Sequence, residues 1–126
     1  MRASIKGAPM RNTFSAEQAE YLKKTGREIE RVSKMPLVNI NRLIKEQLDD
    51  RTPDLLSTDI EGLDYRVIKS LDMSKHRPGV ICAEGVPMFE HSRLSDLVTY
   101  LISQDYVVRG GSMVNSIFVD GRRLGV

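Results

Sequence analysis

Residues 54–64 read DLLSTDIEGLD, and this stretch decides the fold of the chain. It begins as a short apolar run and ends in two carboxylates, Asp59 and Glu61, which is typical of a buried strand that stops at a turn. A second run of the same kind, at residues 80–83, ends at Glu84. The residues between the two runs are enough for one helix. We therefore expect a strand–helix–strand unit with parallel strands.

Apolar residues at spacings of three and four predict the helices around these strands. The predicted helical segments are residues 16–24, 40–48, 63–71 and 93–103. Ser15 and Gln18 form a capping box before the first of them, and Asn39 and Ser92 are the expected N-caps of the second and the last. Gly26 stands where a left-handed C-terminal cap belongs.

The remaining segments complete one α/β domain over residues 1–126. We expect a loose N-terminal segment at 1–12, an edge strand or extended connector at 28–38, strands at 106–108 and 114–119 joined at Gly110–Gly111, and an unassigned tail at 121–126. Alternating strands and helices favour a sheet of parallel strands with helices on both faces. The last two strands are expected to pair as an antiparallel hairpin.

Composition excludes several classes of protein. With 126 residues, 40% apolar and 29% charged, the chain is typical of one soluble globular domain. A net charge of +2 does not indicate a nucleic-acid or membrane partner. No apolar run approaches the roughly 20 residues of a membrane helix. Cys82 is the single cysteine, so an internal disulfide is excluded and a cytoplasmic location is expected.

Polar side chains gather at the predicted carboxyl ends of the two strands, where sheets of this kind bind ligands. Asp59 and Glu61 are two residues apart and point the same way if the strand persists that far. Such a pair can bind a divalent cation, hydrogen-bond ribose or amine groups, or share a proton. The alternative is a purely structural role, because acids at solvent-exposed strand ends also stabilise the N-terminus of a following helix through its dipole. Gly62 allows close approach of a ligand, and Glu84 and His91 follow the second strand.

Other cysteine, histidine, glycine and arginine residues are weaker candidates for a functional site. Cys82 lies inside an apolar strand and is expected to be a buried, inert thiol. His76 belongs to the opposite end of the sheet. Gly110–Gly111 is expected to be a plain hairpin turn, and Arg122–Arg123 a solvated pair of charges.

Five stretches together resemble the FkbM-type S-adenosylmethionine-dependent methyltransferases. They are NTFS at 12–15, MPLV at 35–38, DLLSTDIEGLD at 54–64, SKHRPGVICAE at 74–84 and NSIFVD at 115–120. The most specific combination is the aspartate–aliphatic–glutamate–glycine block after an apolar strand, followed by a second apolar strand that ends in glutamate.

The resemblance implies a Rossmann-like methyltransferase fold, the cofactor S-adenosylmethionine, and methylation of a hydroxyl on a sugar or secondary metabolite. It implies that Asp59 and Glu61 are catalytic, as general base or by positioning the acceptor or a metal, although no metal site is predicted. Asp59 and Gly62 are candidates for cofactor binding. Glu84 and His91 are candidates for binding the small-molecule acceptor.

The family's Gly-rich first strand-turn, and the acid that ends its second strand, have no counterpart in this sequence. The chain is therefore similar to the C-terminal half of the family's domain. In such a half the strand at 54–58 has an exposed edge, which invites pairing with another chain. We expect self-association, or association with a missing N-terminal half.

Two other functions stay open at this point. The first is a non-catalytic remnant or a module that only binds a partner. The second is a metal-dependent nuclease, because Asp59-x-Glu61 and His91-x4-Asp96 superficially resemble the motifs of proofreading exonucleases. Magnesium-dependent degradation of single-stranded DNA distinguishes the nuclease from the methyltransferase.

Overall fold

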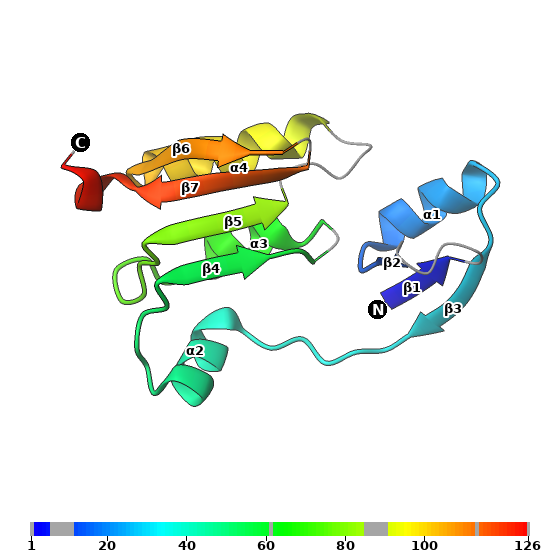
Figure 1. Ribbon diagram of the computed structural model, residues 1–126. Coiled ribbons are helices and arrows are strands. Elements are labelled where there is room, and N and C mark those ends of the chain that lie inside the picture. The colour runs from blue at the N-terminus through cyan, green and yellow to red at the C-terminus, as the bar shows by residue number, and fades with distance from the viewer. Residues whose placement is uncertain (1, 6–11, 61, 85–90, 113, 126) are drawn as a thin grey trace.

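The computed structural model describes residues 2–5, 12–60, 62–84, 91–112 and 114–125, which form two separate sheets (Figure 1). The N-terminal sheet has the order β2-β1-β3 and consists of β1 (Arg2–Ile5), β2 (Asn12–Thr13) and β3 (Ile29–Ser33). The second sheet has the order β4-β5-β7-β6 and consists of β4 (Leu55–Thr58), β5 (Val80–Glu84), β6 (Tyr106–Gly111) and β7 (Asn115–Asp120).

The helices are α1 (Ala16–Lys24), α2 (Ile40–Leu48), α3 (Asp64–Ser70), α4 (His91–Ser103) and a 3-10 turn at Gly121–Leu124. The predicted caps of the first two are confirmed. The Gln18 N–H donates to Ser15 Oγ at 3.2 Å, and the Asn41 N–H donates to Asn39 Oδ1 at 2.9 Å. Gly26 has φ +82°, so the predicted left-handed position is confirmed.

The prediction of a loose segment at residues 1–12 is wrong for the part that the structure describes. Residues 2–5 pair antiparallel with β3, and Ala3 and Ser4 also pair with Thr13 and Asn12. Residues 6–11 lie outside the described part. Strands of two to four residues are too short to show an alternation, and their stabilising partner is far away in the sequence. The extended segment expected at 28–38 contains β3.

The second sheet confirms the predicted parallel pair and the final hairpin. β4 and β5 are parallel, from Leu55 opposite Val80 to Thr58 opposite Ala83, and β6 and β7 are antiparallel. The turn lies later than predicted, because β6 continues through Gly110 and Gly111. A Cβ on Gly111 would lie 2.5 Å from the backbone oxygen of Asn115, so glycine is needed for the close approach of the two strands.

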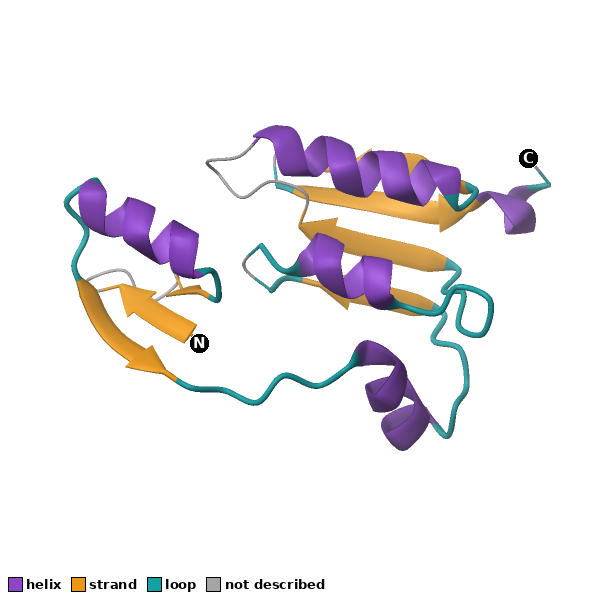
Figure 2. Cartoon of the chain, turned by 180° about the vertical axis from the view of Figure 1, so that it is seen from behind, coloured by secondary structure: helices purple, strands orange, loops and turns teal. Residues whose placement is uncertain are grey.

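The expectation of helices on both faces is not met in the described residues. α3 and α4 lie on the same face of the second sheet (Figure 2). The connections β4–α3–β5 and β5–α4–β6 both join parallel strands and advance in the same direction across the sheet. Right-handed crossovers in one direction place their helices on one face, and a second face is covered only where the direction reverses.

The core lies between this face and its two helices. Its buried members are Ile68, Ile81, Ala83, Leu97, Leu101, Tyr106 and Phe118. Ile40 and Ile44 of α2 form a second cluster with Leu71 beyond α3. Cys82 alternates with the buried Ile81 and Ala83 and is partly exposed on the opposite face, so the prediction of a buried thiol is wrong.

Candidate functional site

The carboxyl ends of β4 and β5 lie side by side, as the parallel pairing requires. The last pair of this ladder joins Thr58 and Ala83. The next residue of each strand is an acid, Asp59 after β4 and Glu84 at the end of β5, so the structure places these two predicted residues at neighbouring positions. Asp59 is exposed, and Glu84 pairs across the sheet with Asn115 of β7.

A buried carboxylate organises the loop between β4 and α3. Asp64, the first residue of α3, is 2% exposed, and its Oδ2 accepts the Ile60 N–H at 3.3 Å. The Ile60 carbonyl in turn accepts the Leu63 N–H at 3.2 Å. Gly62 takes φ +92°, which strongly favours glycine at this turn. The loop that carries Asp59 is therefore tied to the start of α3.

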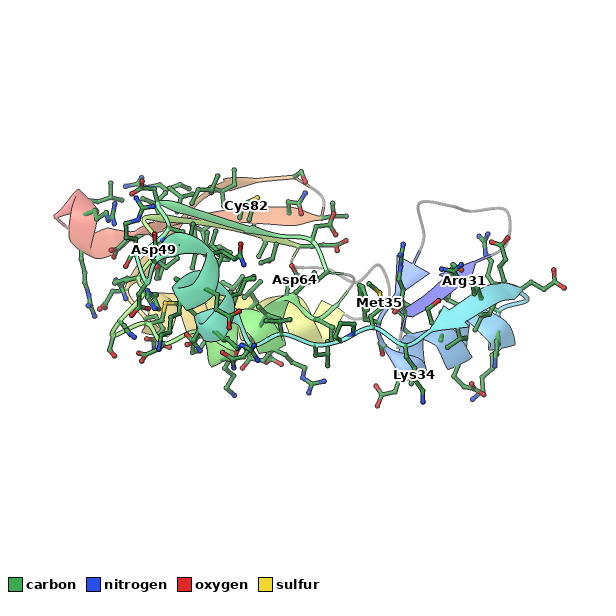
Figure 3. The ribbon with its side chains drawn as sticks, turned by 90° about the horizontal axis from the view of Figure 1, so that it is seen from below. Arg31, Lys34, Met35, Asp49, Asp64 and Cys82 are labelled. Atoms are coloured by element: carbon green, nitrogen blue, oxygen red, sulfur yellow. The ribbon has the colours of Figure 1, made fainter. Side chains whose placement is uncertain are left out.

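Two buried oxygens beside this loop have no hydrogen-bond partner within the described part of the chain. They are Oδ1 of Asp64 and Oγ1 of Thr58. Buried polar atoms are nearly always hydrogen-bonded, so these two oxygens have spare hydrogen-bonding capacity for a water molecule or a ligand group. Asp64 lies at the end of the second sheet that faces the N-terminal unit (Figure 3).

A hollow of about 450 Å³ opens next to Gly62, between the starts of α1 and α3. Helix α1 lies next to the Gly62 turn: a Cβ on Gly62 would lie 4.0 Å from Gln18 Oε1. The lining combines aromatic and charged side chains, among them Phe14, Tyr65, Glu17, Arg66 and Asp96. This mixture suits a small polar molecule with an apolar part.

The other predicted site residues have different outcomes. Glu61 lies outside the described residues, so its role stays a prediction. His91 was expected in a loop but is the first residue of α4, two residues before the predicted start of that helix. Its side chain is not described. Within the described ranges, no three His, Cys, Asp or Glu side chains gather closely enough to bind a metal ion, and no helix is long and apolar enough to cross a membrane.

Sequence reasoning missed Asp64 and Thr58 as parts of the site. An acid in the first turn of a helix is ordinary, because it complements the helix dipole, and its burial cannot be read from the sequence. Phe14 and Arg66 were missed for a related reason. They come from segments about fifty residues apart in sequence, and only the packing of α1 beside Gly62 brings them to one hollow.

The family of the chain follows from a comparison with family models. The model of the methyltransferase FkbM domain matches residues 4–108, so the chain belongs to this family of methyltransferases. The matched range contains the Asp59 loop, Asp64, Glu84 and the whole lining of the hollow. No curated protein and no solved structure matches the chain.

Proposed function

We propose that this chain forms the acceptor side of an S-adenosylmethionine-dependent methyltransferase that methylates a hydroxyl of a small molecule, a sugar being the first candidate. The observation that carries the proposal is the pair of acids Asp59 and Glu84 at neighbouring strand ends, in a chain of this family whose hollow at Gly62 is three residues along the chain from Asp59. A loop held by the buried Asp64 is a rigid support for such a site.

The described residues fit the cationic part of the methyl donor. S-adenosylmethionine supplies, when bound, a methyl group on a positively charged sulfur. Asp59 and Glu84 provide two carboxylates at the carboxyl ends of neighbouring strands, and a carboxylate attracts the positively charged sulfur. In the described part of the chain no strand pairs with the outer edge of β4. We propose that a partner chain supplies the remaining contacts to the donor.

Asp59 is the residue that we assign as general base. Its carboxylate accepts the proton of the acceptor hydroxyl as the oxygen gains its methyl group. General base catalysis of this kind contributes roughly 10²- to 10⁴-fold to a rate. Glu84 orients the acceptor by accepting a hydrogen bond from a second hydroxyl. Asp64 acts as a positioning residue, because it holds the backbone of Ile60 next to Asp59.

Calorimetric titration tests donor binding with a charge-sensitive comparison. S-adenosylmethionine carries the positive sulfur, whereas S-adenosylhomocysteine is neutral there. We expect binding tighter than about 100 µM, equivalent to roughly −5.5 kcal/mol, and a preference for the charged ligand. Asp59→Asn should abolish that preference. Asp54→Asn is the matched control, because Asp54 lies at the other end of β4 with a fully exposed side chain.

Two results contradict the proposal. Absence of heat at about 1 mM of either ligand refutes donor binding by this chain. An unchanged preference in Asp59→Asn removes Asp59 from the site. Transfer of labelled methyl groups to a panel of sugars then tests catalysis, where Asp59→Asn should lower the rate by at least about 100-fold and Asp54→Asn should not.

A further inference from the structure

Residues 2–5 and 12–33, which we call the N-terminal unit, form a body of their own in the described part of the chain (Figure 1). The unit has its own sheet and its own helix, and the Ser4 hydroxyl donates to the Arg31 carbonyl within it at 3.3 Å. Both clusters of the hydrophobic core found in the described residues consist of residues from position 40 onward. The packing that holds the second sheet therefore does not hold the N-terminal unit.

Residues 34–39, which we call the connector, link the N-terminal unit to α2 as one extended stretch (Figures 1 and 2). All six residues are exposed, and Leu37 reaches 82%. Among the described residues, no hydrogen bond or ion pair involves residues 34–38. A segment that lacks both packing and hydrogen bonds changes its φ and ψ angles at little cost, which is the property that a hinge requires.

The hollow of about 450 Å³ lies where the N-terminal unit meets the rest of the chain. Part of its lining comes from the start of α1 and the residues before it, among them Phe14 and Ala16. Another part comes from α3, which contributes Tyr65 and Arg66. Because these two walls belong to different bodies, the width of the hollow depends on the angle at the connector.

From this arrangement we propose that the N-terminal unit is a hinged cap, which turns about the connector and opens and closes the hollow. Two bodies within one chain move relative to each other unless their interface is large and hydrophobic. Here the region between them holds free space and exposed charged side chains, such as Arg66 and Asp96. Rigid-body motion of this kind takes place in microseconds to milliseconds.

A hinged cap couples the hollow to whatever binds in it. A molecule in the hollow contacts both walls only when the cap is closed, so its binding shifts the population towards the closed state. The motion itself requires no methyl donor and does not involve Asp59. The hinge and the proposed function can therefore fail separately.

Electron paramagnetic resonance between pairs of spin labels measures the motion in the full chain, with Cys82→Ser as the background. The pair Lys24→Cys and Ile102→Cys spans the two bodies, from α1 to α4. The control pairs lie within one body each, Lys24→Cys with Val32→Cys and Lys45→Cys with Ile102→Cys, and all four positions are exposed. Because a flexible six-residue chain varies in length by about 5 Å, the first distance distribution should be broader than both controls by about that amount.

Stiffening the connector tests whether the motion arises there. Met35→Pro with Leu37→Pro makes residues 35–37 three consecutive prolines, which form a semi-rigid extended segment and should narrow the distribution between the bodies. Met35→Ala with Leu37→Ala removes the same side chains and should leave it broad. A distribution between the bodies as narrow as the controls overturns the proposal. A broad distribution within the N-terminal unit overturns it as well, because the unit is then not one body. A width that the prolines do not change also overturns it, because the motion then lies outside the connector.

Discussion

Replacing Arg77 with methionine tests the cluster at the end of the second sheet opposite the candidate site. The Arg77 Nη2 donates to Asp120 Oδ1 at 2.8 Å and to the Gln104 carbonyl at 2.5 Å. The guanidinium also lies 4.7 Å from the centre of the Tyr106 ring. The side chains of Arg77 and Asp120 are only 15% and 5% exposed. Arg77 therefore ties α4 and β7 together through a mostly buried ion pair.

The expected cost follows from these contacts. Removing one partner of a buried ion pair costs about 3–5 kcal/mol, because the other charge stays buried. Asp120 keeps its bond from the Arg122 N–H at 3.2 Å, and the Arg123 Nε lies 3.8 Å from its Oδ2. We therefore expect Arg77→Met to lower the free energy of unfolding by about 2–4 kcal/mol. Arg42→Met is the control. Arg42 pairs with Glu46 on the exposed face of α2, where such a pair contributes about 0.3–0.5 kcal/mol.

Urea unfolding followed by circular dichroism measures both variants. The hydrogen bond from Arg77 holds the pKa of Asp120 below its ordinary value. A depressed pKa contributes stability above the unfolded value near 3.8, and that contribution is lost as the pH falls through the folded value. The difference between wild type and Arg77→Met should therefore be full at pH 7 and shrink towards pH 2. Equal losses in Arg77→Met and Arg42→Met would refute the reasoning.

Three further predictions concern the same sheet and its surroundings. Phe118→Ala, at a fully buried position, should lower the free energy of unfolding by about 3–4 kcal/mol in the same urea assay, and a loss below 1 kcal/mol would mean that the core refills the cavity. The pKa values of Asp50 and Asp72 are lowered, chiefly by hydrogen bonds from Lys75 and Ser74, so thermal melts should lose stability as the pH falls below about 3.8 and change little above pH 5. Burial raises the pKa of Tyr106 to about 12, so one of the four tyrosines should ionise late in an ultraviolet pH titration; Tyr106→Phe should remove that last step, and a single common midpoint near pH 10 would contradict it.

Local patterns predicted most of the helices and the central strands. The segments 16–24 and 40–48 match α1 and α2 at both ends, because a capping side chain and an apolar stripe are contained within a few neighbouring residues. The family block at 54–64 placed Asp59 at the end of a strand for the same reason. Local patterns were less reliable at glycine, which occurs both in turns and where two strands approach closely. Gly110 and Gly111 were predicted to form the hairpin turn, but they continue strand β6.

Long-range contacts account for what the sequence left open. β1 and β2 exist through pairing with residues outside their own segment. α4 starts at His91, two residues before the predicted start at residue 93, so Ser92 lies inside the helix and is not its cap. Asp64 belongs to the site through its burial and its hydrogen bond from Ile60, and neither can be predicted locally, since an acid at a helix start has the same sequence signature whether buried or exposed.

The sequence by itself determined which segments are helices and strands of the second sheet, the parallel pair at its centre, and the acids at the strand ends. These follow from the spacing of apolar residues, which is a local property. Only the tertiary structure decided that α3 and α4 share one face, that no helix of the described residues covers the other face, and that α1 borders a hollow at Gly62. Those features depend on the direction of each crossover and on packing between distant segments, and neither is contained in the periodicity of any one segment.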